Sequence, residues 1–158
     1  MSDSYEKCQK TSLAELLPLI EEKLRIGGEV KFNPRGISML PLIRQFKDSV
    51  SVASLKGELC RGDVIFYRRP DGQFVLHRIV GEDKDGYILC GDNQLIKEYG
   101  VKKTWIIGVM TAVWRDGKKV SCTDAAYKVY KNLILPLWGI WLKTKSLLSK
   151  LKKAIKKS

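Results

Sequence analysis

Short apolar segments with a period of two, separated by glycine, proline and aspartate turns, fill most of residues 30–120. Alternation of this kind places successive side chains on opposite faces of a β-strand. The clearest segments are VIFYR at 64–68, FVLHRIV at 74–80, YILC at 87–90 and WIIGVMTAVWR at 105–115. A Pro-Asp-Gly turn at 70–72 joins the first two, so we expect them to pair. About five to seven such strands predict a mainly β domain of coiled antiparallel sheets.

The segments on either side of this region have helical spacing instead. Residues 12–25 (SLAELLPLIEEKLR) carry leucine and isoleucine at intervals of three and four, which predicts a short N-terminal helix. We therefore divide the chain into an N-terminal helical segment at 1–26, a β domain at 27–122 and a C-terminal tail at 123–158.

The C-terminal tail holds most of the excess positive charge. The chain has a net charge of +12, of which +8 lies in residues 123–158 and only +4 in residues 1–122. We expect Pro136 to separate an apolar segment from a basic amphipathic helix at 137–157. On a helical wheel its apolar stripe contains Ile140, Trp141, Thr144, Leu147, Leu148, Leu151 and Ile155, and its lysines occupy the other side. This pattern predicts an anionic membrane surface as partner, with packing on the β domain or on another protein as the alternatives.

Composition excludes several classes of function. No stretch approaches the ~20 apolar residues that span a bilayer, and no secretory signal is visible at the N-terminus. Four scattered cysteines and a single histidine disfavour a zinc site, so we expect no metal or cofactor. The small charge of the body, without a helix-turn-helix pattern before it, disfavours nucleic acid as a partner. We expect a cytoplasmic protein, peripheral on the cytoplasmic face of a membrane.

Three residues have the composition of a hydrolytic triad. His77, the only histidine, lies in the middle of a strand on the face of Val75 and Ile79. Ser38 follows Gly36 in a sharp turn, and Asp92 follows a strand that we expect to neighbour the histidine strand. Each also fits an ordinary structural role when taken alone: a half-buried histidine, a turn serine and a turn aspartate. Together, in this order, they indicate nucleophilic catalysis by a serine.

Four short motifs follow one another along the β domain: GISMLP at 36–41, GDVI at 62–65, HRIVG at 77–81 and GDN at 91–93. In this order they resemble the motifs of the type I signal peptidases and the related self-cleaving repressor proteases. The family divides by its general base, and a histidine followed by arginine marks its Ser-His branch. The resemblance implies a signal-peptidase-like β fold and a serine endopeptidase in which Ser38 attacks the peptide and His77 accepts the proton. It further implies Asp92 as the carboxylate that orients His77, with Glu98 as the alternative.

The resemblance also predicts how the substrate binds. An extended peptide is expected to pair with the strand before the nucleophile. The predicted substrate-binding residues are Val30, Phe32, Gly36, Met39 and Pro41. Some relatives place a serine hydroxyl at the position of Gly36, so the Ser38 backbone N–H is expected to hold more of the oxyanion here. The leading hypothesis is an endopeptidase that cleaves a precursor or leader segment. An inactive member that binds peptides in the same cleft is the alternative, and a repressor-like or nucleic-acid-binding protein ranks third.

Overall fold

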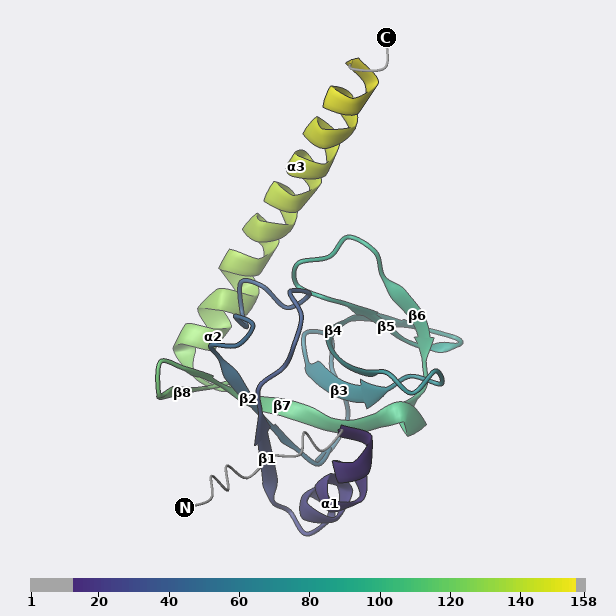
Figure 1. Ribbon diagram of the computed structural model, residues 1–158, viewed down its shortest axis with the longest axis vertical. Helices are drawn as coiled ribbons and strands as arrows, with labels where there is room; N and C mark the ends of the chain where they lie inside the picture. Colours follow the sequence, from purple (N-terminus) through teal and green to yellow (C-terminus); the bar gives the residue numbers. More distant parts are fainter. Residues whose placement is uncertain (1–12, 156–158) are drawn as a thin grey trace, which may run out of the picture.

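The computed structural model describes residues 13–155, and in this part of the chain eight strands form one antiparallel sheet (Figure 1). The strands are β1 (Glu29–Phe32), β2 (Ser49–Ala53), β3 (Val64–Arg68), β4 (Phe74–Asp83), β5 (Gly86–Cys90), β6 (Glu98–Val101), β7 (Ile106–Arg115) and β8 (Lys118–Ser121). Their spatial order is β1-β2-β7-β3-β4-β5-β6, and β8 pairs with β7 outside this path. The predicted mainly β fold is confirmed, including the pairing of β3 with β4. The pattern did not predict β6, whose four residues include a glycine and lack a clear alternation.

Side chains from both faces of the sheet build two apolar clusters. Strand β3 contributes to both, because Val64 and Phe66 belong to one cluster whereas Ile65 and Tyr67 belong to the other. A strand that is buried on both faces has no room for polar alternation, which explains the continuous apolar run in this segment. The first cluster also receives the N-terminal helix α1 (Leu13–Arg25), which confirms the predicted helix.

The long strand β4 pairs differently along its two halves. Residues 74–78 pair with β3, whereas pairing with β5 begins only at Arg78. Within the described sheet, the segment from Phe74 to His77 therefore has a strand on one side only. In an antiparallel ladder, backbone groups point to alternate sides on successive residues. The backbone N–H of Ile79 donates to the Asp63 carbonyl, on the β3 side. The even-numbered residues Phe74 and Leu76 therefore direct their backbone N–H and C=O groups to the opposite, unpaired edge.

The C-terminal region is one continuous helical run rather than two segments. It comprises α2 (Ala125–Val129), the π-helix η2 (Tyr130–Ile134) and α3 (Leu135–Ile155). The predicted separation at Pro136 is wrong, since this proline lies in the first turn of α3. The π-helix immediately before it uses wider hydrogen-bonded turns, which accommodate a residue that has no N–H and a bulky ring.

The predicted boundary at residues 122 and 123 does not separate the tail from the body. Tyr127 and Tyr130 are buried in the first apolar cluster, so the beginning of the helical run belongs to the core. The run leaves the body along α3, which extends beyond the sheet (Figure 1). Among the helices described in residues 13–155, none has both the length and the apolar character needed to cross a membrane.

Candidate active site

The turn that carries Ser38 joins β1 to β2 and contains a backbone conformation that favours glycine. Gly36 has a φ of +103°, a conformation that glycine adopts freely and that other residues avoid. Two residues later Ser38 is half-buried, and the next side chain, Met39, belongs to the core at 5% exposed. The glycine thus allows a sharp change of direction, while Met39 fixes the turn against the sheet.

A buried carboxylate holds the far end of this turn. Asp48 is 0% exposed and accepts hydrogen bonds from the guanidinium groups of Arg44 and Arg115. Arg115 Nη2 also donates to the carbonyl oxygens of Pro41 at 3.1 Å and Leu42 at 3.0 Å. These bonds tie the segment after Ser38 to strand β7, so the turn has a defined geometry.

The segment after β5 is bonded directly to the serine turn. The backbone N–H of Asn93 donates to the Ser38 carbonyl at 2.8 Å, and Asn93 Nδ2 donates to the Ile37 carbonyl at 3.1 Å. Gly91 lies so close to this turn that a Cβ atom on it would be 2.6 Å from the backbone carbonyl oxygen of Ser38 and 3.0 Å from Ser38 Cβ. The glycine and the asparagine of the GDN motif therefore position the residue predicted as nucleophile.

His77 occupies the predicted face of β4. Its side chain lies on the side of Val75 and Ile79, and its ring centroid is 6.5 Å from that of Tyr67. His77 is 6% exposed, and its Nδ1 atom has no hydrogen-bond partner among residues 13–155. Burial lowers the pKa of His77 below its usual value, and the charge of Arg69 lowers it as well; the charges of Glu98 and Asp92 oppose this shift. The imidazole is therefore neutral at pH 7, as a general base must be.

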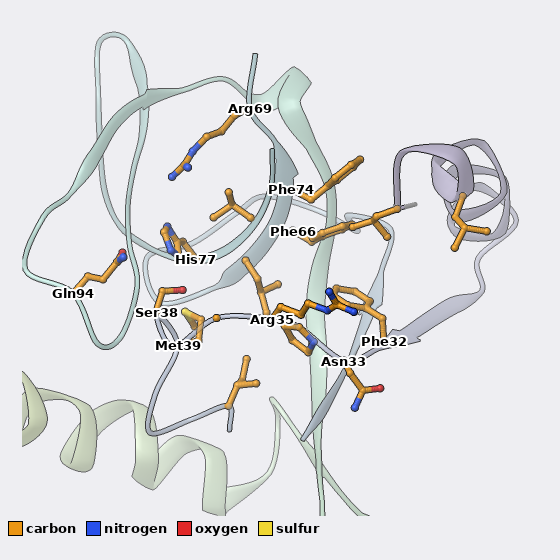
Figure 2. Close-up of a pocket in the computed structure, with 17 residues that line it drawn as sticks. Phe32, Asn33, Arg35, Ser38, Met39, Phe66, Arg69, Phe74, His77 and Gln94 are labelled. Carbon is orange, nitrogen blue, oxygen red and sulfur yellow. The ribbon is translucent and has the colours of Figure 1, made fainter. Parts of the chain in front are cut away.

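Ser38 and His77 line the same cavity of about 670 Å³ (Figure 2). Its walls are mostly apolar and come from α1, β1, β3, β4 and the serine turn, with Phe32, Phe66, Phe74, Leu76 and Met39 among the lining residues. Phe32, Gly36 and Met39 were predicted as substrate-binding residues and do line the cavity. Val30 and Pro41 do not: Val30 packs against the core, and the Pro41 carbonyl is bound by Arg115.

The structure gives Asp92 different partners from the one predicted. Its two oxygens each accept a hydrogen bond from Arg78 at 2.7 Å, and Tyr130 donates a third at 2.9 Å. Arg78 also donates to the Gly62 carbonyl and to Tyr127. Within the described residues Asp92 forms no hydrogen bond with His77, so it acts on the imidazole only through its charge. The prediction that Asp92 orients the ring by direct contact is not supported.

Glu98, the alternative carboxylate, lies on the other side of His77. It accepts hydrogen bonds from Tyr67 at 2.7 Å and from Arg69 Nε at 2.9 Å. Burial raises the pKa of Glu98, but these two donors outweigh burial and bring the pKa below its usual value. A smaller cavity of about 200 Å³ separates this group from His77, and both residues line it. Glu98 is thus ionised, and its charge raises the pKa of His77 more than any other group does.

Gln94 is a site residue that the sequence did not single out. It lines both cavities, and its side chain extends toward Ser38 and His77 in Figure 2. Gln94 Oε1 and Ser38 Cβ lie 2.8 and 3.0 Å from the same point beside Gly91, so they are within about 6 Å of each other. Its position directly after the GDN motif was the available signal, but a glutamine in a turn carries no chemical pattern of its own.

No protein-family model matches this chain, and no curated protein matches it. The resemblance of its four motifs to a peptidase family therefore stays a prediction, to be weighed with the geometry above.

Proposed function

We propose that this protein is a serine endopeptidase of the signal-peptidase-like type, with Ser38 as nucleophile and His77 as general base. The observation that carries the proposal is that the only histidine of the chain and the turn serine line one cavity, although they are 39 positions apart in the sequence. Nucleophilic acyl transfer by a serine needs a neutral imidazole within reach of the hydroxyl, and the shared cavity is consistent with that arrangement.

The proposed reaction has two steps. Ser38 Oγ forms a bond to the peptide carbonyl carbon while His77 Nε2 takes the hydroxyl proton. His77 then returns this proton to the leaving amine as the peptide C–N bond breaks. Water attacks the acyl-enzyme in the second step, again with His77 as base, and releases the carboxylic acid and free Ser38. Nε2 is assigned because Nδ1 is the buried nitrogen.

The tetrahedral oxyanion needs hydrogen-bond donors, and two are at hand. One is the backbone N–H of Ser38 in its glycine-preceded turn. The other is the Gln94 carboxamide, which is close enough to reach the same carbonyl oxygen after a side-chain rotation. Gln94 takes the place of the hydroxyl that some relatives carry at the position of Gly36.

An extended peptide fits the cavity because two strand edges face it. Strand β1 pairs only with β2 in the described sheet, and the Phe74–His77 segment of β4 pairs only with β3. Phe32 of the first edge and Leu76 of the second both line the cavity. A peptide between them would gain backbone hydrogen bonds along the strand and place alternate side chains against the apolar walls.

The test uses an acylating fluorophosphonate probe on the full-length wild-type protein, Ser38→Ala and His77→Ala, with the labelled residue found by peptide mass spectrometry. We expect a label on Ser38 in the wild type and none in either variant. Ser149→Ala, which removes an exposed serine on α3, is the matched control and should label normally. Gln94→Ala should keep the label but lower the rate of labelling about 100-fold to 1000-fold, as the loss of one oxyanion donor does.

A folded wild-type protein that no probe labels would contradict the proposal, provided that the probe labels a known Ser-His peptidase in parallel. The alternative, an inactive protein that binds peptides between the two strand edges, would then be favoured. Peptide binding that survives Ser38→Ala and fails on truncation of Phe32 would support that alternative.

A further inference from the structure

The outer helix α3 exposes a long apolar stripe. None of its described residues is buried, and seven of its apolar side chains are between 45% and 77% exposed. These are Leu137, Ile140, Trp141, Leu147, Leu148, Leu151 and Ile155. They fall on one side of the helix, and α3 extends away from the sheet along its length (Figure 1). A stripe of this size needs a partner to remove it from water.

The opposite side of α3 carries its lysines, with the apolar Leu142 among them. Lys143, Lys145, Lys150, Lys152 and Lys153 lie on it, and α3 contains no acidic residue. Near the beginning of the helix two tryptophans stack, with the ring centroids of Trp138 and Trp141 4.6 Å apart. Lys145 Nζ lies 4.8 Å from the centre of the Trp141 ring, so a cation and an aromatic side chain meet at the border of the stripe. Tryptophan and lysine at such a border are typical of helices that lie in the headgroup layer.

We propose that α3 lies flat in the surface of a membrane that contains anionic lipids, with its apolar stripe in the acyl boundary and its lysines among the headgroups. The positive charge of α3 and its apolar stripe together distinguish three candidate partners: a second copy of the chain, a nucleic acid and an anionic lipid surface. A second copy of the chain would bring another helix without acidic residues against the first, which like-charge repulsion disfavours. A nucleic acid would neutralise the lysines but leave the apolar stripe in water. An anionic lipid surface satisfies both sides of the helix at once.

The start of the helical run connects α3 to the candidate active site through hydrogen bonds. The rings of Tyr127 and Tyr130 are buried in the core. The Tyr127 hydroxyl accepts a hydrogen bond from Arg78, and the Tyr130 hydroxyl donates one to Asp92, which is paired with Arg78. The next residue after Asp92 donates to the Ser38 carbonyl. The helix continues without a break from these tyrosines into α3. A membrane that binds α3 would therefore hold the cavity at a fixed distance from the membrane surface and in a fixed orientation to it. The docking itself does not depend on the proposed peptidase activity.

The test measures flotation of the full-length protein with vesicles of phosphatidylcholine alone or with added phosphatidylglycerol. We expect binding to the anionic vesicles only, weakened by salt. Lys150→Gln with Lys152→Gln should weaken binding about fivefold per lysine, since each is worth ~1 kcal/mol at such a surface. Leu148→Gln with Leu151→Gln should weaken it more than about tenfold, because two leucines no longer gain from leaving water.

The matched control is Ser146→Gln with Ser149→Gln, which places the same side chains on the polar side of the same helix and should leave binding unchanged. Ser38→Ala should also bind as wild type, which separates docking from catalysis. Equal binding to both kinds of vesicle, or binding to neither, would overturn the proposal. So would a dimer in solution that the two leucine substitutions dissociate, or retention on RNA in place of vesicles.

Discussion

Two ionic clusters flank His77, and they differ in burial and in how their carboxylates are bonded. In the Asp92 cluster (Arg78, Asp92, Tyr127 and Tyr130), the arginine and aspartate side chains are 4% and 1% exposed. In the Glu98 cluster (Tyr67, Arg69 and Glu98), the corresponding values are 29% and 24%. The first cluster joins three distant parts of the chain and lies away from the cavities. The second borders both cavities through Arg69.

This difference assigns the two clusters separate roles. A buried ion pair whose hydrogen bonds are satisfied is costly to break. The Asp92 cluster therefore holds the C-terminal helical run and the Gly91–Asn93 segment in place. In the Glu98 cluster the ionised Glu98 raises the pKa of His77, whereas the charge of Arg69 lowers it, so this cluster is placed to adjust the proposed general base.

The largest effect is expected from Asp92→Ala. The substitution leaves the Arg78 guanidinium buried without its carboxylate, which should lower the free energy of unfolding by about 3–5 kcal/mol. Denaturant unfolding measures this loss. Glu29→Ala is the matched control, since Glu29 forms an exposed ion pair with Lys119 at 3.6 Å, and it should change stability by less than about 1 kcal/mol. Unchanged stability of Asp92→Ala with complete loss of activity would instead place Asp92 in direct service of His77.

A smaller effect, confined to the serine turn, is expected from Gly91→Ala. The new methyl group would lie 2.6 Å from the Ser38 carbonyl, so the turn must move. A shift of this size should lower kcat/KM about tenfold to hundredfold and stability by about 1–3 kcal/mol. Gly139→Ala, in α3, is the matched control, because beyond its chain neighbours and the backbone of its own helix no described atom lies within 4 Å of the added methyl group. Equal activities of the two variants would show that Gly91 does not position Ser38.

The sequence predicts the local parts of this arrangement better than the long-range ones. Alternation predicts most of the strands, though not β6, and it predicts the face of His77, because these features depend on neighbouring residues within one strand. The partners of Asp92 lie 14 and 38 positions away, and one of them belongs to a tail that the charge pattern assigned to a separate segment. The Tyr130 hydroxyl reaches Asp92 from this tail, and no periodic pattern in the sequence predicts that contact. The same applies to Gln94, whose relevance depends on the packing of Gly91 against Ser38.

Glu98 was found from the sequence only as an alternative, and its surroundings explain why. It begins the short strand β6, and its two donors come from β3 and the turn that follows that strand. The sequence shows a carboxylate near the GDN motif, but not that Tyr67 and Arg69 keep it ionised beside the histidine. Burial and bonding, which decide between the two carboxylates, appear only in the folded chain.

The smallest and most specific effect is expected from Glu98→Gln on the pH dependence of the reaction. Burial already lowers the pKa of His77, and the Glu98 charge partly offsets this by favouring the imidazolium. Removal of that charge should lower the pKa of His77 further, because the imidazolium loses a favourable neighbour. Because the base must be neutral, the acid limb of kcat/KM should move to lower pH, with the rate near pH 8 little changed. Glu82→Gln, at an exposed position farther along β4, should leave the limb in place. A limb that moves to higher pH would mean that the loss of bonding to Tyr67 and Arg69 outweighs the loss of charge, and that the Glu98 cluster is structural like the Asp92 cluster.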